Sequence, residues 1–220
     1  MKYFSERKFL PLNELLKAPV KQREWELDHF SLTEEQVKSI RMRAMFNMYS
    51  NPFAQYDYRI KASDTFTRLC KGKAVWMSNT PMEQGTNRDF LRHAYGDTFL
   101  AGLGIGMLVL PLLKAPEVTS LHVVELEEDV IKIFMEAASG LDLSKLTVHH
   151  GDAFKPEEFL NGHKFNSLYF DIWKSIDSDN YPETKELYKT YRKHIDYKSS
   201  KPFVDFWVRD YIRREWYTYN

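Results

Sequence analysis

The sequence has little cysteine, no long apolar run and no repeated or low-complexity tract. Its 220 residues include a single cysteine, Cys70, which excludes an internal disulfide and indicates a reducing compartment. No stretch approaches 18 uninterrupted apolar residues, and the first fifteen residues lack the apolar core of a signal peptide. We therefore expect no membrane association and a cytoplasmic location. The absence of repeats excludes solenoids and linker-joined arrays.

An excess of charge of either sign is also absent, because 31 basic residues balance 31 acidic ones. Any argument for an anionic partner must then come from the local distribution of charge. The last forty residues interleave basic and aromatic side chains, in YKTYRKHIDYK and FWVRDYIRREWYTY, and this composition can bind single-stranded nucleic acid. Amphipathic helix faces and a homodimer interface give the same composition, and we favour these over nucleic acid.

The character of the chain changes near Asp97, where we place the main boundary. Residues 1–96 are expected to form an extension of helices and a small β-hairpin that contributes to an acceptor site, a lid or dimer contacts. The pattern Ser31-x-x-Glu34 is typical of a capping box and predicts a helix of about five turns. The other elements expected here are hairpin strands at 66–70 and 73–78, and a short helix capped by Thr86 or Asn87 that stops at Gly96.

In residues 97–220, short β-rich runs alternate with helical stretches. Nearly apolar strands that alternate with helices predict a buried, largely parallel sheet with helices on both sides, so the fold class is α/β. Only 25 residues follow the last helix, which predicts a C-terminally shortened sheet with one further strand at 203–208. The other expected strands are 98–103, 121–125, 146–150 and 166–170, and the expected helices are 106–114, 128–139 and 182–195.

A glycine-rich turn at residues 102–106 follows the first of these strands and opens a helix. Glycines at this place let the backbone approach a ligand at the carboxyl edge of the sheet, although they also serve close packing of a strand on a helix. The next three strands each end in an acid, at Glu125, Asp152 and Asp171. Acids on three strands at one edge favour a ligand site, in which Glu125 accepts ribose hydroxyls and Asp152 an exocyclic amine.

The ligand that fits these residues is a nucleoside without phosphates. The third glycine of the dinucleotide motif G-x-G-x-x-G is missing, since Met107 or Val109 stands at that place, and no G-x-x-x-x-G-K-[ST] motif for ATP occurs. S-adenosylmethionine contains adenosine and no phosphate. Its sulfonium cation also suits residues 97–180, which hold 14 acidic residues and 6 basic ones.

The successive segments LAGLGIGM, VVELEEDVI, VHHGDAF and LYFDIW resemble the cofactor motifs of class I S-adenosylmethionine-dependent methyltransferases, and within them the spermidine-synthase-like branch. The resemblance spans about residues 69 to 195 and implies a Rossmann-like methyltransferase fold. LCKGKAVWMSNTPMEQ is similar to the segment that precedes the glycine loop in spermidine synthases. The stretch from WMSNTPMEQ to FDIWKSIDSDN also resembles small methyltransferase-like proteins of bacteriophages.

This resemblance implies a function, methyl transfer from S-adenosylmethionine to an unidentified acceptor, which we take to be a small molecule in the first place. Asp171 is the expected general base, with Lys174 behind it. The residues that the resemblance assigns to the cofactor are Gly102, Leu103, Gly104 and Gly106 for the methionine part, Glu83 near its amino acid end, Glu125 and Leu126 for the ribose, Asp152 and Ala153 for the adenine, and Asp171 with Trp173 for the reacting end.

Three departures from the family pattern keep other functions open. Leu100 stands where many methyltransferases have an acid, so the methionine amino group must find another partner, Glu83 or Asp171. This absence favours a silent module that binds the cofactor or works through protein contacts. Ile105 stands where spermidine synthases carry an acid, which speaks against aminopropyl transfer; cleavage of the cofactor is a further alternative. Asp171-Ile172-Trp173-Lys174 is similar to the magnesium-binding Asp-x-Trp-Lys of catechol-type methyltransferases, but Asp179-Asn180 comes too soon to complete that site, and we expect no metal.

Overall fold

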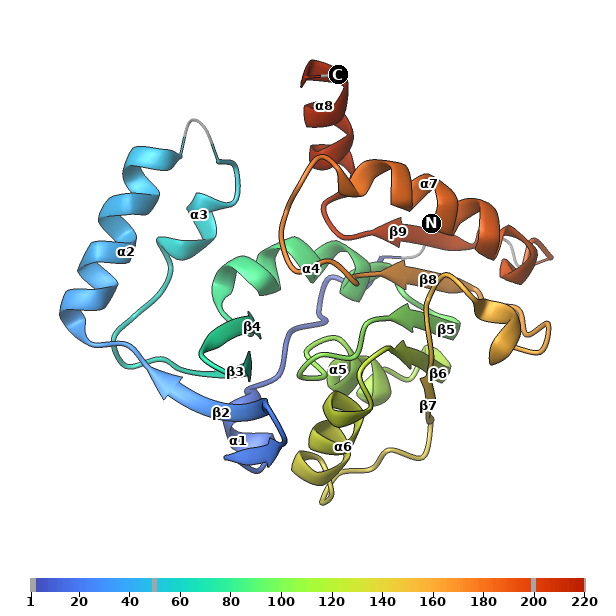
Figure 1. Ribbon diagram of the computed structural model, residues 1–220, viewed down its shortest axis with the longest axis horizontal. Helices are drawn as coiled ribbons and strands as arrows, with labels where there is room; N and C mark the ends of the chain where they lie inside the picture. Colours follow the sequence, from blue (N-terminus) through green and yellow to red (C-terminus); the bar gives the residue numbers. More distant parts are fainter. Residues whose placement is uncertain (1–2, 49–50, 199–200, 220) are drawn as a thin grey trace.

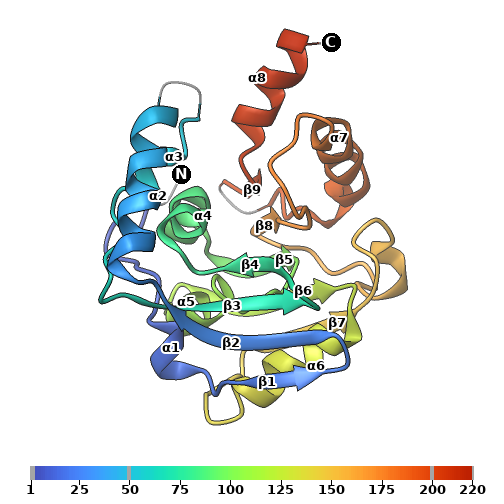
Figure 2. The same cartoon turned by 60° about the vertical axis from the view of Figure 1, so that its left-hand side comes forward.

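A computed structural model describes residues 3–48, 51–198 and 201–219 of the chain. Two β-sheets face each other at the centre of the molecule (Figure 1, Figure 2). The larger sheet has five parallel strands in the order β7-β6-β5-β8-β9. Numbered from β5, this order is 3-2-1-4-5, as in the Rossmann fold, so the predicted α/β class is confirmed. Its strands are β5 (Gly96–Ala101), β6 (Val118–Glu125), β7 (Leu146–His150), β8 (Ser167–Phe170) and β9 (Phe203–Phe206).

Helices cover both faces of the parallel sheet because its central strands are apolar on both sides. Leu100 of β5 belongs to the core under the helices α4, α5 and α6, whereas Phe99 and Ala101 belong to a second core with Leu187 of α7. All three β5 side chains are at most 2% exposed. The helices concerned are α4 (Pro81–His93), α5 (Val109–Lys114), α6 (Glu128–Ala137), the 3-10 turn Pro156–Glu158, and α7 (Asn180–Tyr191) with the 3-10 turn Arg192–His194.

The N-terminal extension is a four-stranded antiparallel sheet, of which the predicted hairpin is one half. Its order is β1-β2-β3-β4, and the hairpin turn holds Gly72 at φ 58°. Trp25, Leu27 and Leu69 of this sheet share one apolar core with the parallel sheet. The extension and the remaining chain are thus packed together. The elements of the extension are α1 (Leu12–Leu15), β1 (Val20–Gln22), β2 (Trp25–Ser31), α2 (Glu34–Asn47), α3 (Ala54–Asp57), β3 (Thr65–Lys71) and β4 (Ala74–Ser78).

Two predicted helix starts in the extension are wrong. Ser31 ends strand β2, where its hydroxyl is 3.0 Å from that of Thr65, and the capping box is formed instead by Thr33 and Gln36. Helix α4 begins at Pro81, five residues before the predicted caps, because Thr80 is extended and a proline at the first helical position presets the helical φ. The helix ends at His93, and Gly96 is already the first residue of β5.

The C-terminal end of the fold consists of a short edge strand and a helix. The predicted strand at 203–208 ends at Phe206 and is followed by α8 (Arg209–Tyr219). Strand β9 is thus the fifth strand of the parallel sheet and forms one of its edges. Figure 1 shows α8 projecting at the top of the molecule beside α7, and α2 at the left-hand edge. Among the described residues, no helix is long and apolar enough to cross a membrane.

Candidate functional site

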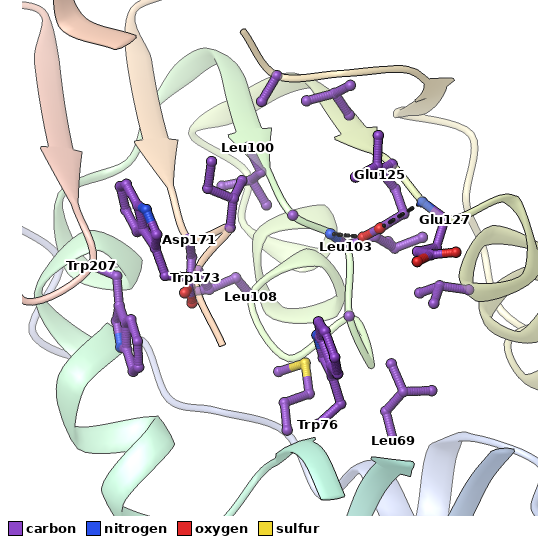
Figure 3. Close-up of a pocket in the computed structure, with 18 of the residues that line it drawn as sticks. Leu69, Trp76, Leu100, Leu103, Leu108, Glu125, Glu127, Asp171, Trp173 and Trp207 are labelled. Carbon is purple, nitrogen blue, oxygen red and sulfur yellow. Dashed lines mark hydrogen bonds between the residues drawn. The ribbon is translucent and has the colours of Figure 1, made fainter. Parts of the chain in front are cut away.

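A pocket of about 320 Å³ lies at the carboxyl ends of the parallel strands, between them and the antiparallel sheet (Figure 3). Parallel strands bring the residues that follow them to a common edge, and open α/β sheets bind ligands there. The N-terminal sheet supplies the facing wall through Trp25, Leu69, Trp76 and Met77. The other main lining residues are Glu83, Asn87, Leu100, Gly102, Leu103, Gly104, Glu125, Leu126, Asp152, Ala153, Tyr169, Asp171, Trp173, Lys174 and Trp207.

Two glycines shape the floor of this pocket. Gly102 leaves β5 at φ 98°, and a Cβ built on it would lie 2.2 Å from the carbonyl oxygen of Asp171. The loop after β5 therefore passes directly against the end of β8, which only glycine permits. Gly104, at φ 50°, approaches the Met77 sulfur, so the glycine loop also touches the antiparallel sheet. The loop is held between the two halves of the chain.

Glu125, at the end of β6, holds the glycine loop in place. Its Oε2 accepts the Leu103 N–H at 2.9 Å and its Oε1 accepts the Glu127 N–H at 3.0 Å. Figure 3 shows both bonds on one carboxylate, with the side chain at the pocket wall. Each carboxylate oxygen has a second lone pair, so Glu125 keeps acceptor capacity for hydroxyl groups of a ligand.

Asp152 and Ala153 follow β7, and both line the same pocket. Its Oδ1 accepts the Phe154 N–H at 2.9 Å, a local turn that fixes the loop after the strand. Gly151 lets Phe159 pack close to this loop, since a Cβ on Gly151 would lie 3.1 Å from the Phe159 ring. Asp152 thus has a fixed place on the side of the pocket nearest β7.

The deepest part of the pocket holds two buried carboxyl groups, Glu83 of α4 and Asp171 after β8. Burial, with a smaller contribution from the charge of Asp171, raises the pKa of Glu83 to about 8. Burial also raises the pKa of Asp171, to about 7, against a hydrogen bond from the Asn87 amide that lowers it. Both groups can therefore take up or release a proton near neutral pH, as a general base must.

Asn87 contributes an unpaired acceptor beside these two acids. Its Nδ2 donates to the Glu83 carbonyl at 3.0 Å, while its Oδ1 is buried without a hydrogen-bond partner. The residue is 0% exposed and lines the pocket. A buried carbonyl oxygen without a partner costs free energy. Two carboxyls and this oxygen together form an acceptor-rich end that suits a donor-bearing or cationic group.

Tryptophans form much of the remaining wall. Trp25, Trp76, Trp173 and Trp207 all line the pocket, and Figure 3 shows Trp76 opposite the parallel strands. The Trp173 indole N–H donates to Glu183 at 2.6 Å, and the Trp207 indole N–H donates to Thr86 at 3.0 Å. These bonds fix two of the aromatic planes.

Eleven of the twelve site residues named from the sequence line this one pocket, and Gly106 does not. A Cβ on Gly106 would lie 2.2 Å from the Phe134 ring, so this glycine serves the packing of the loop on α6. The Lys174 ammonium lies 5.0 Å from the centre of the Trp76 ring, over its face. Neither His149 nor His150, at the end of β7, lines the pocket.

Sequence reasoning missed the contribution of the antiparallel sheet and of the C-terminal strand. Trp25 and Trp207 come from segments with no motif, and Trp76 lies in a segment whose resemblance gave it no role; the folded chain brings all three to the pocket. Asn87 was considered as a helix cap, but it lies in the interior of α4, one turn after Glu83. The spacing of four residues between Glu83 and Asn87 was the available signal, because it places both on one helix face.

Comparison with known proteins shows similarity at the level of fold. No protein-family model matches the sequence, and no curated protein matches it. Spermidine synthase from Thermotoga maritima aligns with a TM-score of 0.44 and 11% identity, over 82% of this chain and 53% of that chain. The N-methyltransferase NodS from Bradyrhizobium japonicum, in complex with S-adenosyl-L-homocysteine, aligns with a TM-score of 0.40 and 14% identity, over 54% and 59% of the two chains.

Fibrillarin from Aeropyrum pernix, with natively bound S-adenosyl-L-methionine, aligns with a TM-score of 0.38 and 15% identity. The alignment covers 48% of this chain and 43% of that chain. The chain thus spans between 43% and 59% of the length of these three structures. At these identities the similarity concerns the fold.

Proposed function

We propose that the protein is an S-adenosylmethionine-dependent methyltransferase of class I with a still unidentified acceptor. The observation that carries this proposal is the convergence of Glu125, Asp152 and Asp171, which follow strands β6, β7 and β8, on one pocket beside the glycine loop. Motif resemblance in the same residues supports it. The resemblance of the sequence to small methyltransferase-like proteins of bacteriophages also supports this proposal.

The donors and acceptors of the pocket fit the parts of S-adenosylmethionine. Glu125, with Leu126 beside it, would accept the ribose hydroxyls, and Asp152 the adenine amine next to Ala153. The loop from Gly102 to Gly104 would pass along the methionine part. At the acceptor-rich end, Glu83 and the unpaired Asn87 Oδ1 would accept the methionine ammonium, which leaves Asp171 for the reacting end.

The pocket residues also account for transfer chemistry. S-adenosylmethionine, when bound, supplies a methyl group on a positive sulfonium that a nucleophile attacks in line. The protein's part is to hold the acceptor in that line and to exclude water, which the tryptophan walls do. Asp171 takes the proton of an acceptor that has one to lose, because its pKa of about 7 lets it act as a base near neutrality. Lys174, over the Trp76 ring, positions that wall.

Calorimetric titration tests the proposal with three ligands: S-adenosylmethionine, S-adenosylhomocysteine and decarboxylated S-adenosylmethionine. We expect the first two to bind and Glu125→Ala to weaken both at least ten-fold, since hydrogen bonds to a charged group contribute about 1.5–3 kcal/mol. Glu35→Ala, in an exposed position of α2, is the matched control and should bind as the unchanged protein does. Because Glu125 also holds Leu103, the thermal unfolding of each variant is measured alongside.

The same titration separates the alternatives. A preference for the decarboxylated ligand would support aminopropyl transfer, against which the fully buried Ile105 in the glycine loop speaks. Binding of S-adenosylmethionine without transfer to any acceptor would support a silent cofactor-binding module. Absence of binding by all three ligands would contradict the proposal.

A further inference from the structure

A second hollow, of about 540 Å³, lies between α7, β9 and α8, outside the pocket described above. Figures 1 and 2 both show these three elements side by side at the C-terminal end of the fold. We call it the C-terminal groove. Its lining residues are Tyr181, Thr184, Lys185, Tyr188, Ile195, Tyr197, Pro202, Val204, Phe206, Arg209 and Arg213.

The charged side chains that line the C-terminal groove are all basic. Lys185 comes from α7, and Arg209 and Arg213 come from successive turns of α8; none of the lining residues that the structure describes carries a carboxylate. The acids nearest to the two arginines are Asp205 and Asp210, at 3.4 Å or more. The side chain of Asp210 is 74% exposed, so its pairs with Arg209 and Arg213 are weak and open to exchange for a stronger anion.

Exposed tyrosine rings stand among these cations. Tyr188 is 43% exposed and Tyr197 is 58% exposed, although both line the groove. Tyr217 of α8, 68% exposed, extends the row by packing edge-on against Tyr181 at 5.7 Å between ring centres. Accessible aromatic rings beside several cations suit a ligand that has both flat bases and phosphates.

We propose that the C-terminal groove binds single-stranded nucleic acid. Bases would stack on the faces of Tyr188 and Tyr197, and phosphates would pair with Lys185, Arg209 and Arg213. A duplex hides its base faces in its own stack, and a simple polyanion has none, so the tyrosines favour an unpaired strand over both. The sequence alone favoured helix faces or a homodimer interface as the reason for the basic and aromatic composition of the last forty residues. The C-terminal groove favours nucleic acid instead.

The groove lies beside the wall of the candidate active pocket. Phe206 lines the groove, and the next residue, Trp207, lines the pocket. Glu183, on the same helix as Lys185, accepts the indole N–H of pocket residue Trp173. A strand bound in the groove would therefore pass near the pocket, but its binding needs no cofactor.

Fluorescence anisotropy with an end-labelled single-stranded oligonucleotide, as DNA and as RNA, tests the proposal on the full chain without cofactor. We expect saturable binding at low salt, with a slope of log K against log salt of about −2 for three phosphate contacts. Tyr188→Ala should weaken binding about five-fold or more, because stacking on one ring accounts for at least that. Arg213→Glu should weaken it and make the salt slope less steep by about 0.7.

Matched controls come from residues that do not line the C-terminal groove. Tyr58→Ala and Lys38→Glu change an exposed tyrosine and an exposed lysine on the α2 and α3 side and should leave binding unchanged. Heparin and a duplex of the same sequence serve as competitors. Absence of saturable binding at low salt overturns the proposal. The proposal is also overturned if heparin competes as well as the unlabelled single strand and Tyr188→Ala binds with unaltered affinity. That result would indicate a general anion-binding surface. Since no cofactor is present, neither result bears on the methyltransferase proposal.

Discussion

Asp171 raises the pKa of Glu83, although the two residues come from elements that are 88 positions apart in the chain. Burial is the larger cause, and together the two bring the pKa of Glu83 to about 8, while burial raises the pKa of Asp171 itself to about 7. Two carboxyl groups in one pocket resist joint ionisation. At a pH between the ordinary carboxyl pKa and these raised values, the pair is therefore protonated in the folded state and ionised in the unfolded state.

Stability should consequently fall as pH rises through this range. Between the ordinary carboxyl pKa and about pH 8, the native state binds more protons than the unfolded state, so the free energy of unfolding decreases with pH. Glu83→Gln removes one of the two groups and should flatten the decrease by an amount on the order of 1–3 kcal/mol. Urea unfolding at about pH 5, 7 and 9 measures this, with Glu35→Gln as control. Equal pH dependence in both variants would contradict the burial of Glu83.

Gly102→Ala should damage both stability and the pocket. Its φ of 98° and the 2.2 Å approach of a Cβ to the Asp171 carbonyl oxygen require the backbone to shift. We expect a loss of about 3 kcal/mol or more, measured by urea unfolding. Gly72→Ala, at φ 58° with nothing within 4 Å, should cost only about 1 kcal/mol. Gly140→Ala, which has open space and an ordinary φ, should be nearly neutral. Similar losses in all three would contradict the close approach of loop and strand.

The parallel sheet could be predicted because its central strands are short apolar runs that alternate with helices. Strand β7 coincides with its predicted bounds, and β5 was displaced by two residues because Gly102 already turns out of the sheet. In the extension, β1 has only three residues, and in β2 the alternation of Trp25 and Leu27 with Glu26 and Asp28 is broken at His29 and Phe30. Neither strand had a local signal strong enough to be recognised.

Some residues of the candidate site could likewise be predicted from the sequence, and others could not. Glu125, Asp152 and Asp171 could be predicted, because a residue that follows a parallel strand has its place set by the strand order. Trp25 and Trp76 could not, because their place depends on how one sheet packs against the other. The unpaired Asn87 oxygen depends on the same packing. Long-range packing, unlike strand order, leaves no spacing in the sequence.

Ligand binding should alter the intrinsic fluorescence strongly, because four of the five tryptophans line the pocket. We expect S-adenosylhomocysteine to change the emission intensity and wavelength of the unchanged protein. Trp76→Phe, which keeps an aromatic ring in the wall, should reduce this change while it leaves binding within about 1 kcal/mol of the original value. Titration followed both by fluorescence and by calorimetry checks this. Calorimetric binding with unaltered emission would contradict the placement of the ligand among these rings.

A cluster of three histidines lies apart from the pocket, on the face of the sheet that α7 covers. His122 Nδ1 is 3.1 Å from His149 Nε2, and the rings of His122 and His163 are 4.7 Å apart. Asp97 Oδ2, at 3.7 Å from His163 Nε2, is the acid that faces them. Burial, followed by the charges of His163 and His149, lowers the pKa of His122 to about 4, and burial also lowers that of His149.

These histidines should make the fold sensitive to acid. A histidine whose pKa is lowered in the folded state contributes stability that is fully present above about pH 6.5 and is lost as pH falls towards about 4. His122→Phe should therefore lose less stability between about pH 7 and 5 than the unchanged protein, by about 1 kcal/mol after allowance for solvent screening. Exposed His150→Gln is the matched control. The pH dependence of stability that the histidines cause has the opposite sign to that of Glu83 and Asp171. If stability falls less between about pH 7 and 5 in His122→Phe but not in Glu83→Gln, the effect belongs to the histidine cluster. An equal fall in His122→Phe and His150→Gln would contradict the prediction.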